Sequence, residues 1–232
     1  MSADPLRPVR AEIEHARRAL RRLHRTTDAP GAPLALVVVV TVLLVLWGNA
    51  VVVAGRQLGG QNVLTLVAHG ALALVVTTIL LRRGWSRHAL GLVPPRPDPD
   101  SRNLRLALTV VSVSGLVAAA ATLALDPAKR LDVVRLLVGT ATGEEVLHRS
   151  ALLALWTSSP VTPVITTVAN VAAFAGWHVA GAFHDGRFHP LDVAVPAAGA
   201  LVFLWARLRY RSVAAPIFVH LATNLPGIIL AP

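Results

Sequence analysis

Residues 33–54 read PLALVVVVTVLLVLWGNAVVVA, and no charged side chain occurs between Asp28 and Arg56. A helix that crosses the hydrocarbon core of a bilayer needs about 20 mainly apolar residues, so this stretch predicts a membrane-spanning helix. The chain of 232 residues is 54% apolar and 15% charged, whereas soluble domains carry about 25% charged residues. The sequence therefore predicts an all-α, polytopic bundle of transmembrane helices.

Further uncharged runs extend this pattern to the C-terminus. They predict about seven spans, near residues 33–54, 61–81, 105–125, 137–157, 163–183, 190–206 and 212–230.

The N-terminal segment has a different character from the rest of the chain. Residues 5–26 place apolar side chains at steps of three and four and arginines mostly on the other faces, which predicts an amphipathic helix. Such a helix would either lie on an anionic membrane surface or pack on the protein itself. We therefore expect a basic segment at 1–30 and a membrane-embedded domain at 31–232, with its motifs within 137–230.

The basic residues are distributed unevenly between the predicted loops. Sixteen lie in the N-terminal segment, in 82–105 and in 207–211, and five lie in the remaining loops. The positive-inside rule then predicts a cytoplasmic N-terminus in an integral protein of a bacterial plasma membrane. The net charge of +10 is explained by topology, and no nucleic-acid partner is expected, because no basic patch lies on a soluble domain.

A polar site is predicted inside the bilayer. The segment Gly143-Glu144-Glu145-Val146-Leu147-His148-Arg149 places two carboxylates in the fourth span, and such groups cost roughly 2.5–3.5 kcal/mol each on insertion scales. Phe174 and His178 follow on the fifth span, and His220 and Asn224 on the seventh. At 1.5 Å per residue, the polar groups of the three spans lie at about 18–22 Å from the basic turns. Their shared depth predicts that they meet.

Helical spacing separates the two glutamates. Glu145 and Arg149 are four residues apart, so we interpret them as a supporting ion pair. Glu144 points about 100° away and is left for the cavity, as a general base. In a second interpretation, Arg149 and His148 merely satisfy both carboxylates. His148 shares a face with Glu144, where it would either hydrogen-bond the carboxylate or pack.

Each histidine alone is typical of a satisfied core residue, but their common depth with the acidic pair favours a site. His220 and Asn224 share a helix face and could donate hydrogen bonds to a developing oxyanion. Phe174, one turn from His178, would wall the cavity. His69 and Asn170 are interpreted as packing or supporting residues.

The motifs GluGlu-x-x-x-Arg, Phe-x-x-x-His and His-x-x-x-Asn, in this order on successive spans, resemble the CPBP family of intramembrane proteases. That family includes type II CAAX prenyl endopeptidases, such as the Ras-converting enzyme, and bacteriocin-processing or immunity (Abi-like) proteins. The resemblance implies that Glu144 activates water with help from His178, and that His220 and Asn224 stabilise the oxyanion. It also implies a supporting role for Glu145 and Arg149. His148 departs from the family, which usually has an apolar or aromatic residue there.

The sequence thus predicts an intramembrane glutamate-type endopeptidase without a cofactor. Its partners would be the lipid bilayer and a peptide or protein substrate with an apolar or lipidated, CAAX-like segment. A zinc-dependent version would use Glu144, His178 and His220 as ligands, although the spacing HisGlu-x-x-His is absent. Two further hypotheses are a non-catalytic immunity or scaffold protein and a small transporter or proton relay.

Overall fold

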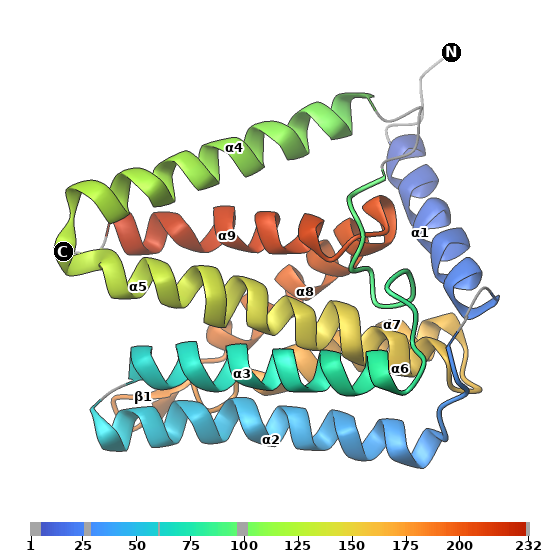
Figure 1. The fold of residues 1–232 in the computed structure, drawn as a ribbon, viewed down its shortest axis with the longest axis horizontal. Helices are drawn as coiled ribbons and strands as arrows, with labels where there is room; N and C mark the ends of the chain where they lie inside the picture. The colour runs from blue at the N-terminus through green and yellow to red at the C-terminus, as the bar shows by residue number, and fades with distance from the viewer. Residues whose placement is uncertain (1–5, 26–28, 60, 97–101, 231–232) are drawn as a thin grey trace.

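The computed structural model describes residues 6–25, 29–59, 61–96 and 102–230, and its fold is all-α apart from one short hairpin. Most helices run side by side along one direction, whereas α1 crosses one end of the bundle (Figure 1). In chain order the elements are α1 (Arg7–Arg25), α2 (Leu34–Leu58), α3 (Gln61–Arg82), α4 (Arg102–Leu125), η1 (Pro127–Lys129), α5 (Arg130–Val134), η2 (Arg135–Glu144), η3 (Val146–Leu152), α6 (Leu153–Thr157), α7 (Pro163–Trp177), β1 (Phe183–His184), β2 (Arg187–Phe188), α8 (Leu191–Tyr210) and α9 (Ala214–Ile229).

Three helices are long and apolar enough to cross a membrane, namely α2, most of α3, and α8. The stretches Thr109–Leu125 and Pro127–Thr157 pass the same test together, although they are bent by 116°. The apolar helices α7 and α9 have 15 and 16 residues, fewer than the about 20 that a perpendicular span needs. The structure thus shows three to four candidate spans, fewer than the predicted seven. The predicted span at 163–183, for example, ends as a helix at Trp177 and continues as turns and a strand.

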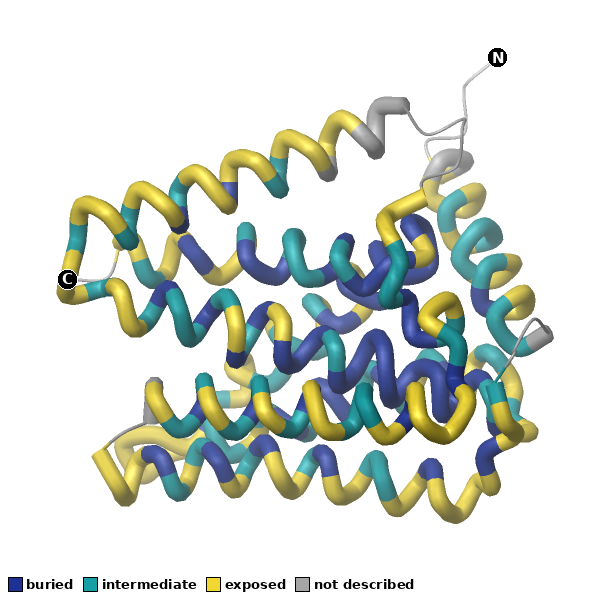
Figure 2. Tube along the Cα trace, viewed as in Figure 1, coloured by how far each residue is buried: buried dark blue, intermediate teal, exposed yellow. Residues whose placement is uncertain are grey.

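The outward sides of α2, α3 and α4 are exposed and apolar (Figure 2). Several of their large side chains are more than half exposed, among them Leu43, Leu46, Val67 and Leu74. Soluble monomers rarely expose contiguous apolar patches larger than a few hundred Å². This surface is consistent with helices that face acyl chains, as expected of an integral membrane protein.

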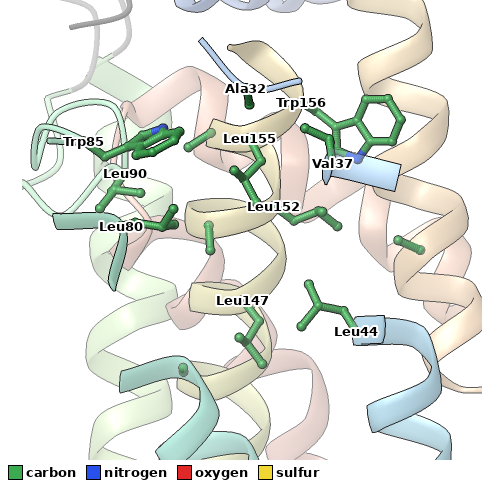
Figure 3. Close-up of a cluster of buried hydrophobic side chains, with 14 of the residues drawn as sticks. Ala32, Val37, Leu44, Leu80, Trp85, Leu90, Leu147, Leu152, Leu155 and Trp156 are labelled. Atoms are coloured by element: carbon green, nitrogen blue, oxygen red, sulfur yellow. The ribbon is translucent and has the colours of Figure 1, made fainter. Parts of the chain in front are cut away.

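The largest buried cluster surrounds η3 and α6, where they contact α2, α3, α7 and the loop after α3 (Figure 3). Leu147, Leu152 and Leu155 contribute one face of this cluster, and the Trp156 indole covers α2. The indole Nε1–H donates to Thr41 Oγ1 over 3.1 Å, which satisfies the polar end of a ring that is otherwise buried in hydrocarbon. This packing fixes the helix that carries the acidic pair against the first two long helices.

Two glycines let the glutamate-bearing segment approach α3 at backbone distance. A Cβ at Gly139 would lie 2.9 Å from the Leu66 Cα, and one at Gly143 would lie 3.2 Å from the His69 carbonyl carbon. Small residues four apart are a common means of close helix packing in membranes. The close approach brings His69 next to the acidic pair.

We expect Gly139→Ala to lower the free energy of unfolding by about 1–3 kcal/mol, because its methyl group would overlap backbone atoms of α3 that cannot move aside. The matched control is Gly70→Ala, whose Cβ would meet only the Val138 side chain, at 3.4 Å across the same interface. Alanine is the better helix former, so Gly70→Ala should be neutral or stabilising. Thermal or denaturant unfolding in detergent would measure both. An equal loss in both variants would contradict this account of the interface.

The helix α1 packs on the protein through the second half of its apolar stripe. Leu20 is 3% exposed and contacts α6 and α8, whereas Leu6, Val9 and Ile13 are at least half exposed. The Trp205 indole donates to Glu12 over 3.1 Å and ties the helix to α8. Of the two predicted placements, the structure therefore shows α1 packed on the protein. The apolar side chains in the first half of α1 remain exposed.

Candidate active site

The acidic motif lies in helical turns that are widened to hydrogen bonds between residues five apart, over Arg135–Glu144 and Val146–Leu152. Such wide turns are rare and often occur at functional sites. The site residues of this stretch, Glu144, Glu145, His148 and Arg149, are all buried, with at most 4% of their surface exposed. The sequence predicted an ordinary α-helical spacing here, and the structure differs from it in the width of the turn.

Glu144 lies between two histidines from different helices. Its Oε1 is 3.8 Å from Nδ1 of His69 on α3, and its Oε2 is 3.8 Å from Nε2 of His178, at the end of α7. Both distances exceed that of a direct hydrogen bond, and Oε2 has no hydrogen-bond partner among the described residues. Glu144 is therefore a buried carboxylate with an acceptor atom still free. His178 is more accessible, with 27% of its side chain exposed.

The end of α7 fixes the orientation of the His178 ring. The last turn tightens, so the His178 backbone N–H donates to Ala175 instead of Phe174. The freed Phe174 carbonyl accepts a hydrogen bond from His178 Nδ1 over 2.8 Å. Because a carbonyl can only accept, Nδ1 carries a proton, and Nε2 is the ring nitrogen that faces Glu144. When the ring is neutral, Nε2 and the Glu144 carboxylate are two acceptors that face the same space, an arrangement that suits a water molecule donating to both.

Glu145 has partners of its own. Its Oε2 lies 3.3 Å from Arg149 Nε, and its Oε1 accepts a hydrogen bond from His220 Nδ1 over 2.9 Å. The Arg149 guanidinium carbon also lies 4.1 Å from the centroid of the Phe174 ring, within the range of a cation–π contact. His220 stacks on Phe203 of α8, with ring centroids 4.6 Å apart. The two glutamates therefore organise two neighbouring clusters, and Phe174 lies against both His178 and His220.

His148 packs rather than bonds. Its ring is fully buried at the edges of Phe174 and Trp177, with centroids 5.1 and 5.0 Å away, and neither ring nitrogen has a hydrogen-bond partner in the described structure. Of the two roles considered for His148, the structure therefore shows packing against aromatic rings and no hydrogen bond to Glu144. Its backbone carbonyl accepts a hydrogen bond from the buried Asn170 amide over 2.8 Å, so Asn170 holds the glutamate helix to α7.

Asn224 is not brought into the cluster. It lies one turn beyond His220 on α9 and is exposed, and its side chain has no hydrogen bond to another described residue. His220 itself faces Glu145 rather than Glu144. Of the four predicted catalytic residues, Glu144 and His178 face each other directly, His220 lies beyond Phe174, and Asn224 lies outside.

Helix α2 holds the broken end of α7 through Asn49. Its carboxamide Nδ2 donates to the Gly176 carbonyl over 2.8 Å, while its Oδ1 accepts a hydrogen bond from the Ala180 N–H. These two backbone groups would bond each other if α7 continued as a regular helix. Asn49 is thus inserted into the interrupted turn that contains His178. Arg56 holds the following residues by donating to the carbonyls of Ala180, Gly181 and Phe183.

The sequence interpretation missed Asn49 and gave His69 only a packing or supporting role. Both are uncharged polar residues within apolar runs of α2 and α3. Their rarity in such runs was a usable signal, because polar groups at membrane depth usually face the interior of the bundle. The spacing along one helix could not reveal which atoms of α7 and η2 they meet.

For an endopeptidase of the kind that the sequence predicts, with His178 as a catalytic residue, we expect Asn49→Leu to reduce kcat for peptide cleavage roughly 10²-fold with little change in KM, because small displacements of a catalytic group have effects of this size. The matched control is Thr41→Val, which removes another interhelical hydrogen bond of α2, that to Trp156, away from His178. The ¹⁵N shifts of the His178 imidazole should also lose the pattern of an Nδ1-protonated ring. Unchanged shifts and kcat in the folded variant would show that Asn49 is only structural.

The hairpin after α7 holds a second histidine cluster, which contacts the first turn of α8. His184 Nε2 and Asp192 Oδ2 are 2.9 Å apart, and the His184 ring stacks on His189 with centroids 3.7 Å apart. The hydrogen bond to Asp192 raises the pKa of His184 above its ordinary value of 6.5. The charged pair therefore stabilises the hairpin fully below about pH 6.5 and loses this effect as pH rises through the raised pKa.

We accordingly expect an NMR titration of His184 to have its midpoint above 6.5, and Asp192→Asn to move that midpoint down. Amide exchange in β1 and β2 should become faster as pH rises through the midpoint, after correction for intrinsic exchange. Asp132→Asn, on α5, serves as the control for loss of one carboxylate. A midpoint that stays in place in Asp192→Asn would contradict the assigned cause.

Within the described ranges, no group of three or more His, Asp or Glu side chains is arranged to hold a metal ion. The ligand set considered for zinc is divided in the structure, because Glu144 lies against His178 whereas His220 lies against Glu145.

Comparison with known proteins gives one match. Residues 126–226 match the model of a protein family described as Rce1-like, type II CAAX prenyl endopeptidase. No curated protein and no solved structure matches the chain. The matched region contains both glutamates, Arg149, Phe174, His178, His220 and Asn224, and it ends before the last residues of α9. It contains neither α2 nor α3, which supply Asn49 and His69.

Proposed function

We propose, on the premise that residues 126–226 form an Rce1-like domain of the type II CAAX prenyl endopeptidase class, that this protein is an intramembrane endopeptidase with Glu144 as its general base. The observation that carries the proposal is the position of Glu144, which is 4% exposed and lies 3.8 Å from both His69 and His178. A carboxylate so enclosed, with a free acceptor atom facing a partly accessible imidazole, has the parts needed to activate a water molecule.

In the proposed reaction a water molecule donates its two hydrogens to Glu144 and His178. Glu144 takes one proton as the water oxygen bonds to the scissile carbonyl carbon, which becomes a tetrahedral oxyanion. The carbon–nitrogen bond then breaks, and the protonated Glu144 returns the proton to the leaving amine nitrogen. The products are a carboxylic acid, which ionises, and an amine. No metal takes part in these steps, and His178 orients the water throughout.

His220 is the proposed oxyanion donor. Its Nδ1–H is engaged by Glu145, so it can donate from Nε2 only as an imidazolium ion. Glu145, Arg149 and a protonated His220 would together carry one positive charge beside the reacting carbonyl, which favours a developing anion. Asn224 would donate to the oxyanion only if a bound substrate filled the space between Asn224 and His220. We therefore assign the larger share of oxyanion stabilisation to His220.

The substrate is proposed to be a peptide or protein with an apolar or lipidated segment near the cleaved bond. We place all seven helical segments that match the predicted spans in the bilayer. The arginine-rich N-terminal segment and the loops at 82–105 and 207–211 then lie in the cytoplasm. The short α7 and α9 then leave room for water to reach His178. An apolar tail would enter between helices from the acyl chains, and the CAAX-like choice of substrate rests on the family match.

The test is cleavage of a library of lipidated and unmodified peptides by the purified protein in vesicles, with products identified by mass spectrometry. We expect cleavage that persists after exhaustive chelation and dialysis. Activity that disappears on chelation and returns with zinc would replace this mechanism by the metal-dependent one. Absence of any cleavage, with peptides that still bind, would favour a non-catalytic immunity or scaffold protein.

A further inference from the structure

A polar cavity lies at the end of the bundle that α1 crosses, and Glu144 is not among the residues that line it. It has a volume of about 210 Å³ and is bounded by α1, the loop after α3, and the end of α8. Figure 1 shows this loop running from the end of α3 toward α1. The charged and polar residues of the cavity wall that bear on its function are Arg22, Ser86, His88, Arg207 and Arg211. None of the described residues that line it is acidic.

Arg207 is the unusual member of this wall, because it is 1% exposed yet no described carboxylate pairs with it. Its Nε donates to the Arg149 carbonyl over 3.1 Å and one terminal nitrogen to the Ala89 carbonyl over 3.2 Å. The other terminal nitrogen has no hydrogen-bond partner in the described structure. Two backbone carbonyls accept hydrogen bonds from the guanidinium, but no described carboxylate balances its positive charge.

The loop after α3 is shaped around this side chain. Gly91 has φ +68°, and a Cβ there would lie 2.4 Å from the Arg207 guanidinium carbon. Its carbonyl accepts a hydrogen bond from the Val213 N–H over 2.9 Å. The buried position of Arg207 is therefore built into the fold and is not an accident of one rotamer.

An unpaired buried charge is costly, and a fold that retains one gains by binding the opposite charge. Three arginines around one cavity match a multiply charged oxyanion better than a single carboxylate, because an exposed guanidinium can bond two oxygens of a phosphate group and one terminal nitrogen of Arg207 still lacks a partner. The Ser86 hydroxyl adds a donor. We infer that this cavity binds a phosphate group, supplied either by the headgroup of an anionic lipid or by a soluble phosphate.

The site is also connected to the acidic motif. Arg207 bonds the backbone of Arg149, and Arg149 in turn pairs with Glu145. A bound phosphate would hold Arg207 in place and so stabilise the helix that carries both glutamates. The inference does not depend on whether the protein cleaves peptides.

The test measures thermal unfolding of the full chain in uncharged detergent, with inorganic phosphate compared with sodium chloride at equal ionic strength. We expect a rise in Tm of about 3–6 °C at a phosphate concentration about tenfold above its Kd. Arg22→Gln and Arg211→Asn should lose most of this rise. Asn is chosen at 211 because the backbone there has φ +53°, which Asn tolerates. Arg18→Gln, on the same helix but outside the cavity wall, should keep it.

A second arm identifies the source of the phosphate group. The same variants are melted, without inorganic phosphate, in vesicles of phosphatidylcholine with or without phosphatidylglycerol. Stabilisation by phosphatidylglycerol alone assigns the site to a lipid headgroup, and stabilisation by inorganic phosphate alone assigns it to a soluble ligand. If neither raises Tm, or if Arg18→Gln loses the effect as fully as Arg22→Gln and Arg211→Asn do, the inference is overturned.

Discussion

Glu144→Gln is expected to reduce peptide cleavage roughly 10²–10⁴-fold, the usual contribution of a general acid–base group. The amide keeps the size and most of the hydrogen bonding of the carboxylate but cannot take a proton from water. Because Glu144 lies between two histidines without a direct hydrogen bond, the change removes little that supports the fold. Single-turnover cleavage in vesicles would measure the rate, and thermal unfolding would measure stability in the same preparation.

The control for this variant is Glu14→Gln, which makes the same chemical change on the exposed face of α1, where Glu14 pairs with Arg21 over 2.8 Å. Its cleavage rate should equal that of the wild type. A Glu144→Gln protein that is folded and cleaves within a few-fold of the wild-type rate would exclude Glu144 as the base. The scheme would also fail if activity were lost only together with the fold.

Arg149→Met is expected to lower the free energy of unfolding by about 3–5 kcal/mol, the usual cost of leaving one member of a buried ion pair unpaired. Both Glu145 and Arg149 are 0% exposed, and the guanidinium also lies over the Phe174 ring. Methionine fills a similar apolar volume, so the loss should come mainly from the uncompensated carboxylate. Unfolding in detergent at several denaturant concentrations would measure it.

The double variant Glu145→Gln/Arg149→Met distinguishes charge from packing. It removes both charges, so it should recover a large part of the stability lost by Arg149→Met alone. Two losses that simply add would show that the residues act independently, which the 3.3 Å contact between them argues against. Cleavage should stay low in the double variant, because it lacks the Glu145 carboxylate that accepts the hydrogen bond from His220 Nδ1.

The all-α character of the fold could be predicted from the sequence, because most residues of the uncharged runs lie in helices. Of the seven predicted spans, the structure shows three to four candidates. Hydropathy measures how apolar a run is, but it does not show where the backbone leaves the helix, and residues 178–182 form turns although they are mostly apolar. The wide turns around Glu144 were not predicted, because the spacing of the polar residues was interpreted as that of an ordinary α-helix.

The sequence predicted most of the residues that form the candidate site, but it did not predict most of the contacts between them. Spacing along one helix placed Arg149 next to Glu145, since both lie on the same element. It could not place His220, which joins Glu145, or His69, which joins Glu144, because these contacts depend on how separate helices are rotated. Asn224 shows the same difficulty, as it lies one turn from His220 and yet points out of the cluster.

The insertion of Asn49 into the end of α7 bears on how this protein can be dissected. A fragment that begins at the matched region would retain the carboxylates and lose the partner of the Gly176 carbonyl and the Ala180 N–H. Both backbone groups would then lack their hydrogen-bond partner, so we expect the turn around His178 to rearrange. The region that matches the family model is therefore smaller than the part of the chain that must be expressed. Truncated, domain-swapped or circularly permuted variants should retain α2 and α3.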